Sequence, residues 1–392
     1  MSLGVYIQVP FCQTKCTYCN FHTGVVSRDR YALYADAVCR EIALFAEGKG
    51  SADDPAADAV DTVYIGGGTP SLLDPSALAK ILATLRSHFA TKGSFAEITL
   101  EADPETITEQ KSAAWLAAGF NRISLGAQSF NDQELKAAGR MHRRADIFHA
   151  VETLRHAGFQ NTSIDLIAGL PHQSRESWDG SLTEIQKLRP EHISIYMLEI
   201  DEGSRLGKES LAGGSRYSAA AIPADDEMAD FYESACTQLA ANGYDHYEIS
   251  NWALPGLRSR HNLKYWRREP YIGFGAGAHS FDGRTRWANL HDSARYVACI
   301  EQGISPREQI EGVTPGQALE EEFFLGLRQL EGIDLARIER EYDAELPGRV
   351  SDLRNRIAHL QSQGLIELNG TCMRLSPARL SVSNEVLVEL LG

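Results

Sequence analysis

Two hydrophobic patterns alternate along the first half of the chain. Short apolar runs typical of buried strands recur, and longer segments with apolar residues at helical spacing lie between them. The expected strands are residues 4–9, 62–65, 97–101, 122–126, 163–167 and 192–197. The expected helices are residues 30–47, 75–88, 109–118, 143–156 and 177–188. Strands joined by helical crossovers predict an α/β fold with a parallel sheet, either doubly wound or curved into a barrel.

The second half of the chain is less regular. Residues 203–224 are rich in Gly, Ser and Ala and predict an inserted loop, which a helix over 225–242 follows. Pro and Gly residues at 305–317 indicate a domain boundary. We therefore expect one domain over residues 1–305 and a second over 306–392, in which helical segments precede a hairpin that turns at Asn369 and Gly370. Both turn positions would need positive φ, and helices followed by a hairpin resemble a winged helix.

The composition narrows the class of protein. The 392 residues carry 53 acidic and 38 basic side chains, a net charge of −15 that disfavours non-specific binding to nucleic acid. There is no run of 18 apolar residues to span a membrane, and the first residues lack the basic start of a signal peptide. We therefore expect a cytoplasmic protein. Seven cysteines, an odd number, argue against a disulfide framework, and three of them fall within eight residues, which indicates a metal site.

The three clustered cysteines, Cys12, Cys16 and Cys19, follow the first expected strand with the spacing Cys-x3-Cys-x2-Cys. Three thiolates can hold a [4Fe–4S] cluster and leave one iron open for a small ligand. A zinc site would need a fourth ligand, for which His22 is the nearby candidate. The spacing, with Tyr18 just before the third cysteine, resembles the radical-SAM superfamily. This resemblance implies a partial (β/α)6 barrel, a cluster whose open iron binds S-adenosylmethionine (SAM), and an electron donor for the cluster.

Polar groups follow several of the other expected strands. A Gly-Gly-Gly-Thr-Pro turn begins at Gly66, and Glu101, Gln128 and Asp165 lie near strand ends, which in a parallel barrel open onto one rim. Taken singly, these features are also compatible with an ordinary strand–helix turn and with paired carboxylates. Together with the sequence Gly-Ala-Gln-Ser-Phe and Arg140, they resemble the oxygen-independent coproporphyrinogen oxidase branch of the superfamily. The resemblance implies SAM contacts from Tyr6, Tyr18, Gly67, Gly68, Thr69, Glu101, Gln128, Arg140 and Asp165.

Within that branch the sequence departs from the oxidases. They carry a further cysteine two residues after the third, where this chain has Phe21, and a long extension before the first strand, which here begins almost at Met1. A segment that reads Arg-His-Asn-Leu-Lys-Tyr-Trp resembles the HemW-type heme chaperones instead. The resemblance implies heme contacts from His261, Asn262, Tyr265 and Trp266.

The residue types of this segment are compatible with heme. Imidazole is a common axial ligand of heme iron, and aromatic rings pack against the macrocycle. Neighbouring basic residues suit heme propionates: Arg258, Arg260, Lys264, Arg267 and Arg268. His279 is a second ligand candidate. The same residue types are also typical of a solvated basic loop with a structural histidine.

We therefore expect a heme chaperone that binds heme and delivers it to an acceptor protein, and that carries the SAM-bound cluster. The alternatives are an oxygen-independent coproporphyrinogen III oxidase of porphyrin biosynthesis and another radical-SAM enzyme with a different substrate. Oxidase activity is not expected, whereas SAM cleavage is compatible with the motifs. Binding of DNA by the winged-helix-like domain is disfavoured, because its expected recognition helix, 349–363, mixes Arg with Asp352 and Gln.

Overall fold

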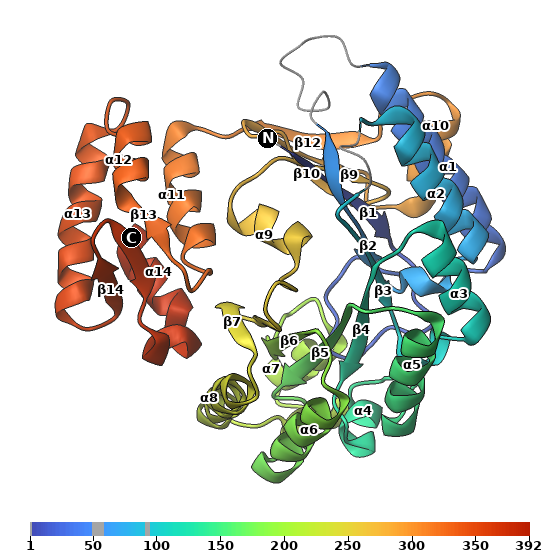
Figure 1. Ribbon diagram of the computed structural model, residues 1–392, viewed down its shortest axis with the longest axis horizontal. Helices are drawn as coiled ribbons and strands as arrows, with labels where there is room; N and C mark the ends of the chain where they lie inside the picture. Colours follow the sequence, from blue (N-terminus) through green and yellow to red (C-terminus); the bar gives the residue numbers. More distant parts are fainter. Residues whose placement is uncertain (1, 49–58, 91–94) are drawn as a thin grey trace.

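The computed structural model describes residues 2–48, 59–90 and 95–392. Within these ranges a 12-stranded sheet runs in the order β12-β11-β10-β9-β1-β2-β3-β4-β5-β6-β8-β7. The six predicted strands form its parallel centre: β1 (Leu3–Val9), β2 (Val60–Gly67), β3 (Glu97–Ala102), β4 (Arg122–Gln128), β5 (Thr162–Ala168) and β6 (His192–Met197). Helices connect these strands in sequence order, and Figure 1 shows that the sheet curves into a partial barrel. The predicted fold class is thus confirmed.

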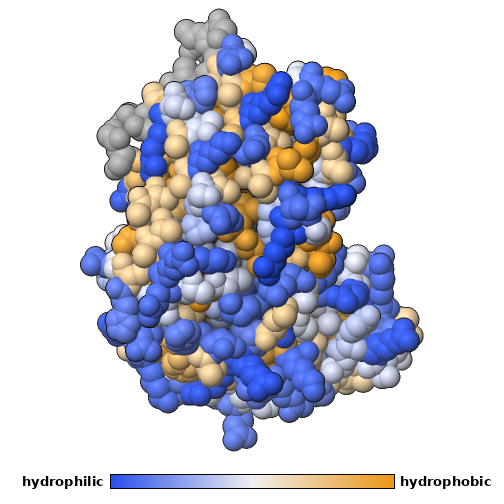
Figure 2. Space-filling view, turned by 90° about the vertical axis from the view of Figure 1, so that its right-hand side faces the viewer, coloured by the Kyte–Doolittle hydropathy of each residue, from blue (hydrophilic) through white to orange (hydrophobic). Residues whose placement is uncertain are grey.

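Helices cover the outer face of this sheet (Figure 1). The five expected helices are present, with ends within two residues of prediction: α1 (Asp29–Glu47), α2 (Pro75–His88), α3 (Glu109–Ala118), α5 (Arg144–Ala157) and α6 (Arg175–Leu188). Gly119 and Gly158 end α3 and α5 in the left-handed conformation, with φ of 104° and 108°. The short α4 (Asp132–Ala137) was not predicted, because six residues are too few to show a helical pattern. On this helix-covered side, polar and apolar residues are interspersed (Figure 2).

Side chains of the central strands alternate between two environments. Every second residue is aliphatic and buried in the core, as Ile164 and Leu166 on β5 show. The residues between them face the inside of the curve, because neighbours on a strand point to opposite faces of a sheet. The strand register places inward-facing polar residues side by side: Tyr6 with Tyr64, Glu101 with Ser124, and Asp165 with Ser194. The barrel interior is therefore polar.

The amino-terminal end of the barrel is closed by α9 (Arg260–Trp266). The buried carboxylate of Glu97, at the start of β3, accepts hydrogen bonds from the backbone N–H groups of Arg260 and His261, at 2.9 and 3.0 Å. Nδ1 of His261 lies 2.9 Å from the hydroxyl of Thr62 on β2. A carboxylate at a helix N-terminus satisfies free N–H groups and suits the helix dipole. The short helix is therefore fixed as a plug beneath the parallel strands.

Further strands extend the sheet at both edges. β9 (Tyr271–Phe274) pairs in parallel with β1, and β8 (Asn251–Ala253) pairs antiparallel to β6. The remaining members are antiparallel to their neighbours: β7 (Asp245–Glu248), β10 (His279–Phe281), β11 (Thr285–Asn289) and β12 (Arg307–Gly312). Two helices pack on the extensions and the outer layer: α8 (Asp225–Ala241) contacts α6, and α10 (Ser293–Glu301) contacts α1.

The segment expected as an irregular loop, 203–224, contains regular structure. It holds α7 (Arg205–Leu211) and a 3₁₀ helix (Arg216–Ala221), so the loop prediction is wrong. The buried side chain of Leu206 anchors α7, and its N–H donates to the carbonyl of Thr17 in the cysteine loop at 2.8 Å. One buried anchor in a short helix leaves no periodic signal in a Gly- and Ser-rich sequence. The segment therefore lies against the loop that carries the cysteines.

The C-terminal part combines helices with a small antiparallel sheet of strand order β13-β15-β14. Its elements are α11 (Pro315–Gly326), β13 (Ile333–Asp334), α12 (Leu335–Tyr342), α13 (Pro347–Ser362), β14 (Ile366–Asn369), β15 (Cys372–Leu375), a 3₁₀ helix (Pro377–Val382) and α14 (Ser383–Leu391). The expected hairpin is confirmed, but its turn is centred one residue later, because Asn369 pairs with Cys372 and Gly370 has the positive φ, 60°. Since β12 still belongs to the large sheet, the division at 305/306 stays a prediction.

None of the helices among the described residues is both long and apolar enough to cross a membrane. The longest, α1, has 19 residues, and its exposed side carries charged and polar groups. Apolar side chains are instead collected in the core between the sheet and its helices.

The plug predicts a stability change for Glu97→Ala. Loss of the carboxylate leaves the buried N–H of His261 and the partly buried N–H of Arg260 without their acceptor, which should lower the free energy of unfolding by about 1–3 kcal/mol. Urea unfolding monitored by circular dichroism measures the change. Glu152→Ala, an exposed change on α5, is the matched control. Equal unfolding midpoints for the two variants would contradict the role assigned to Glu97.

Candidate metal and cofactor site

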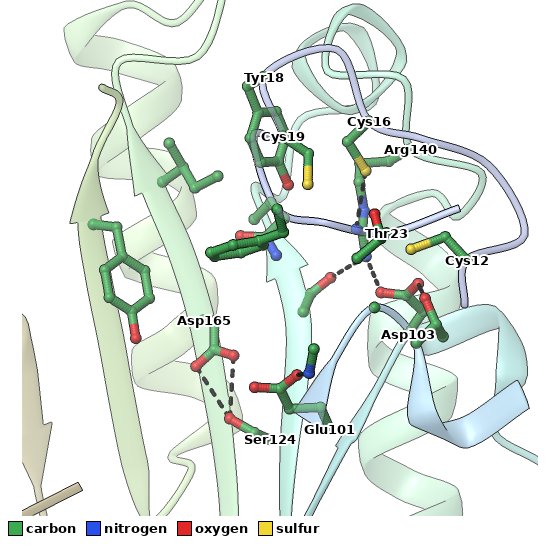
Figure 3. A pocket seen from close by; sticks show the side chains of 18 of the residues that line it. Cys12, Cys16, Tyr18, Cys19, Thr23, Glu101, Asp103, Ser124, Arg140 and Asp165 are labelled. Atoms are coloured by element: carbon green, nitrogen blue, oxygen red, sulfur yellow. Dashed lines mark hydrogen bonds and ion pairs between the residues drawn. The ribbon is translucent and has the colours of Figure 1, made fainter. Parts of the chain in front are cut away.

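The three clustered cysteines lie on the loop after β1, at the carboxyl-terminal rim of the barrel (Figure 3). The loop folds back on itself, because the N–H of Cys12 donates to the carbonyl of Gly24 and the N–H of Gly24 donates to that of Pro10, at 3.0 and 2.9 Å. From α7, the side chain of Arg205 donates to the carbonyl of Lys15. All three thiols are free of disulfides and partly exposed. Backbone hydrogen bonds therefore determine where the thiols lie.

A cavity of about 410 Å³ extends from this loop into the barrel, a volume typical of small-molecule sites. It is lined by nearly all residues predicted to hold the cluster and SAM: Cys12, Cys16, Tyr18, Cys19, Gly67, Gly68, Thr69, Glu101, Gln128, Arg140 and Asp165. Tyr6 does not line the cavity; its ring stacks 6.0 Å from that of Tyr64, which does. The structure thus brings the predicted rim residues around one space.

The glycine turn after β2 packs against the cysteine loop. A Cβ added to Gly68 would lie 2.4 Å from the carbonyl oxygen of Phe11 and 3.0 Å from Sγ of Cys12. At Gly67, φ is +116°, and its N–H donates to Oε2 of Glu101 at 2.9 Å. The turn therefore needs glycine at 68 because of the protein loop beside it, and at 67 because of its backbone conformation.

Arg140 connects the cysteine loop to β3 and β4. Its guanidinium donates to Sγ of Cys16 at 3.4 Å, to the carbonyl of Gly126 at 2.8 Å and to the carboxylate of Asp103. Asp103 in turn accepts from the hydroxyl of Thr69 at 2.9 Å. The thiolate is the form of cysteine that binds metal, and a neighbouring cation balances part of its charge. Arg140 is therefore a positioned positive charge at the thiol wall of the cavity (Figure 3).

Two carboxylates lie deeper in the barrel than the thiols (Figure 3). Glu101 accepts from the hydroxyl of Tyr64 at 2.8 Å, and burial raises the pKa of its carboxyl to about 7. Asp165 accepts from the hydroxyl of Ser124 at 3.1 Å, and burial raises its pKa as well. Both groups offer acceptor oxygens to hydroxyl or ammonium donors of a ligand.

Several residues of the cavity were not predicted. Tyr64, Asp103, Arg122, Ser124 and Ser194 line it beside the predicted set. Four of these, Tyr64, Arg122, Ser124 and Ser194, lie at every second position of β2, β4 and β6, on the side that faces the barrel interior. Following this alternation along each expected strand would therefore have identified them. Asp103 lies just after β3, two residues beyond Glu101 on the same phase.

The residues present fit the cofactors that the sequence implies. Among the described residues, no three His, Cys, Asp or Glu side chains are close enough together to share a single metal ion. Figure 3 shows the three sulfur atoms spread along the cavity wall, as thiolates that each bind a different iron of a cubane would be. Burial raises the pKa of the Cys12 and Cys19 thiols, so metal coordination would supply the stabilisation that their thiolates need.

The predicted heme contacts on α9 lie mostly away from the cavity. The ring of His261 is fully buried, with Nδ1 beside the Thr62 hydroxyl and Nε2 2.9 Å from the hydroxyl of Tyr265. Burial lowers the pKa of His261 to about 3, so the ring is neutral. Asn262 reaches the cavity, whereas the ring of Trp266 packs under the guanidinium of Arg328, 4.6 Å away. Both ring nitrogens of His261 are thus engaged in the closed plug.

Three of the five basic residues around α9 are paired with carboxylates, whereas Arg260 and Arg267 are exposed. Arg258 pairs with Asp245 and Glu331. Lys264 pairs with Asp61 and Glu269, and Arg268 with Glu321 and Glu322 on α11. These pairs fasten α9 to the sheet and to the C-terminal helices. Of the five basic side chains expected to bind heme propionates, three are already paired with carboxylates.

His279, the second ligand candidate, is placed differently. It starts β10 and is exposed at the rim side of the sheet, unlike His261. Partial burial and the neighbouring imidazole of His291 lower its pKa. A neutral, accessible imidazole of this kind can serve as a metal ligand.

Comparisons with known proteins agree with this geometry. The family model of the radical SAM superfamily matches residues 6–185, and that of the HemN C-terminal domain matches residues 313–378. The chain is 32% identical over 389 residues to the heme chaperone HemW of Bacillus subtilis, with 99% of both chains covered. It is 36% identical to the HemW of Synechocystis, covering 86% of this chain and 81% of the relative. For the HemW of Escherichia coli, identity is 36%, with 71% and 69% covered.

One solved structure has the same fold over almost the whole chain. Coproporphyrinogen III oxidase (HemN) from Escherichia coli superposes with a TM-score of 0.83 and covers 99% of this chain and 90% of its own. Sequence identity between the two is 24%, so this likeness concerns the fold alone. It supports the barrel followed by the C-terminal unit.

Gly68→Ala should disturb the cysteine loop. The added methyl overlaps the Phe11 carbonyl, so the loop must shift, and we expect a loss of about 1–3 kcal/mol in the free energy of unfolding. We also expect less iron bound per chain after reconstitution. Gly180→Ala is the control, because no atom lies within 4 Å of a Cβ there and alanine favours its helix. Wild-type stability and iron content in Gly68→Ala would refute the packing argument.

Glu101 should make stability depend on pH. Because its folded pKa of about 7 lies above the ordinary 4.5, the folded protein keeps a proton that the unfolded chain has lost between these values. Stability due to this group is therefore greatest at low pH and falls as pH rises toward 7, by about 2–3 kcal/mol. Glu101→Gln should flatten this decline in urea unfolding between pH 5 and 8. Parallel pH profiles for variant and wild type would exclude the effect.

Proposed function

The chain belongs to the HemW family of the radical SAM superfamily, and on this basis we propose that it is a heme chaperone, which binds heme and delivers it to an acceptor protein. The observation that carries the proposal is the 32% identity over 389 residues, with 99% of both chains covered, to a relative named as a heme chaperone. A match of this length includes the barrel, the plug α9 and the C-terminal unit. The cysteine motif alone would indicate only the superfamily.

In this proposal Cys12, Cys16 and Cys19 hold a [4Fe–4S] cluster whose remaining iron takes the amino and carboxylate groups of SAM. When bound and reduced, such a cluster can donate one electron to the sulfonium of SAM. The chain supplies the surroundings. Arg140 keeps positive charge beside Cys16, and Glu101 accepts hydrogen bonds deeper in the cavity.

The same proposal gives a role to the other residues predicted to contact SAM. Asp165 offers acceptor oxygens, and Tyr18 covers the cavity beside the third cysteine. Gln128 lines the wall from the end of β4, where its backbone has a positive φ of 66°. A residue held in this uncommon backbone conformation is typical of functional positions. Thr69 and the Gly67–Gly68 turn complete the wall on the β2 side.

The oxidase alternative differs at one exposed position. Phe21, 64% exposed on the cysteine loop, occupies the place of the additional cysteine of the oxidases. A phenyl ring cannot act as a thiol ligand or redox group. The proposal therefore favours transport of heme over oxidation of its precursor, in a cytoplasmic setting with an electron donor for the cluster and a heme-accepting partner.

Contact of heme iron with His261 requires a change in the plug. The imidazole would have to leave both Thr62 and Tyr265 and become exposed. The assignment of His261, Asn262, Tyr265 and Trp266 as heme contacts thus remains a prediction for a rearranged α9.

One reconstituted sample tests the proposed function. Anaerobic protein with an assembled cluster is titrated with hemin and, in parallel, is given coproporphyrinogen III, SAM and a reductant. We expect saturable hemin binding with a stable Soret band and no formation of protoporphyrinogen IX. Transfer of the bound heme to apomyoglobin, followed by its spectrum, measures delivery.

The control is Cys16→Ser, which should lose the visible absorbance of the cluster because one thiolate ligand is removed. Turnover of coproporphyrinogen III without a stable heme complex would establish the oxidase alternative. Full cluster absorbance in Cys16→Ser would exclude that cysteine as a ligand.

A further inference from the structure

Three histidines from separate segments gather at the rim of the barrel. His22 follows the third cysteine, His279 begins β10, and His291 follows β11. The ring centroids of His22 and His291 are 4.3 Å apart, and those of His279 and His291 are 6.4 Å apart. We call these three residues the rim imidazoles. Segments so distant in sequence bring imidazoles together only through the fold, not through local composition.

Two of the rim imidazoles are exposed, whereas His261 is fully buried. His22 and His279 are exposed, and His291 is half-buried. Nδ1 of His291 has no hydrogen-bond partner among the described residues and points at Gly277, where a Cβ would lie 2.9 Å away. Partial burial, followed by the neighbouring His291, Arg286 and His22, lowers the pKa of His279, which keeps it neutral. Neutral imidazole is the form that binds iron.

The surroundings of His22 match the edge of a porphyrin. Phe21 and Val25 expose 64% and 61% of their surface, among the highest values of any large apolar side chain in the described chain. Lys15 lies on the same loop, with its Nζ 3.5 Å from the carbonyl of Phe21. A macrocycle needs apolar contact for its face, an axial ligand for its iron and a cation for a propionate. This short loop carries one of each.

We propose that heme iron is bound at the rim by a rim imidazole, with the macrocycle against Phe21 and Val25. The inference deepens the proposed heme-chaperone function and rests on it, but it moves the iron ligand from the plug to the cysteine loop. Binding there requires no rearrangement of α9, because His22 and His279 are already exposed. Heme iron accepts one or two axial ligands, so a single accessible ring of the three suffices.

The position also explains why heme and the cluster share a chain. His22 is three residues beyond Cys19, so a heme at the rim lies on the loop that the cluster holds in place. Heme at this site and the three cysteines would therefore share one loop, whose backbone hydrogen bonds already fix its course.

The test compares hemin binding by the cluster-loaded protein and by variants of the rim imidazoles. The combined variant His22→Ala, His279→Ala and His291→Ala should bind hemin at least tenfold more weakly, with loss of the histidine-ligated absorbance and electron paramagnetic resonance signals. The three single variants identify the ligating ring, and added free imidazole should restore the signals in the combined variant. His156→Ala, exposed on α5, is the matched control and should behave as wild type.

Each outcome decides a specific claim. Unchanged hemin affinity and spectra in the combined variant, with cluster absorbance and thermal unfolding like wild type, would overturn the rim assignment. Loss of hemin binding in His261→Ala alone, with its fold and cluster intact, would also overturn it and return the ligand to the plug. If the wild-type protein itself binds no hemin, the proposed function fails first. Phe21→Ser with an intact cluster should weaken hemin binding without changing the axial-ligand spectrum, and an unaltered affinity would remove Phe21 from the site.

Discussion

The two-residue alternation of side chains along six parallel strands is the constraint on which the rest of this structure depends. It places aliphatic residues such as Ile164 and Leu166 outside, against helices, and polar residues such as Asp165 inside. A polar interior must satisfy its own hydrogen bonds or hold a ligand. Tyr64 and Glu101 do so with each other, and Glu97 does so with α9. The groups left at the upper end, near the thiols, form the cavity.

Much of this arrangement could be predicted from the sequence. Strand and helix positions follow from periodicity, and the rim follows from the rule that parallel strands open toward one side, so Glu101, Asp165 and the cysteines were placed together correctly around one cavity. The unpredicted parts depend on single long-range contacts. Leu206 anchors α7 by one buried side chain, and Glu97 holds α9 from a position 164 residues away in the chain. Neither contact leaves a local pattern.

The burial of His261 shows the limit of residue-type arguments. Histidine, tyrosine and tryptophan in one short segment are the groups that heme needs, yet the same groups also make a tight plug. Here Thr62 and Tyr265 occupy both nitrogens of the ring, and the nearby Lys264 and Arg268 pair with carboxylates. Whether such a motif binds a ligand or packs as a plug depends on the residues that distant strands place beside it. Those residues are too far away in the sequence to be recognised from the motif itself.

The plug has a further consequence for how the chain is made. Thr62 and His261 are 199 positions apart, and Glu97 and His261 are 164 apart. During synthesis from the N-terminus, β1 to β6 can pair long before α9 leaves the ribosome, and contacts of such sequence separation form late. Until then the amino-terminal end of the nascent partial barrel is open to water. Arrival of α9 covers that end, so the cavity is left to open at the rim that carries the cysteines.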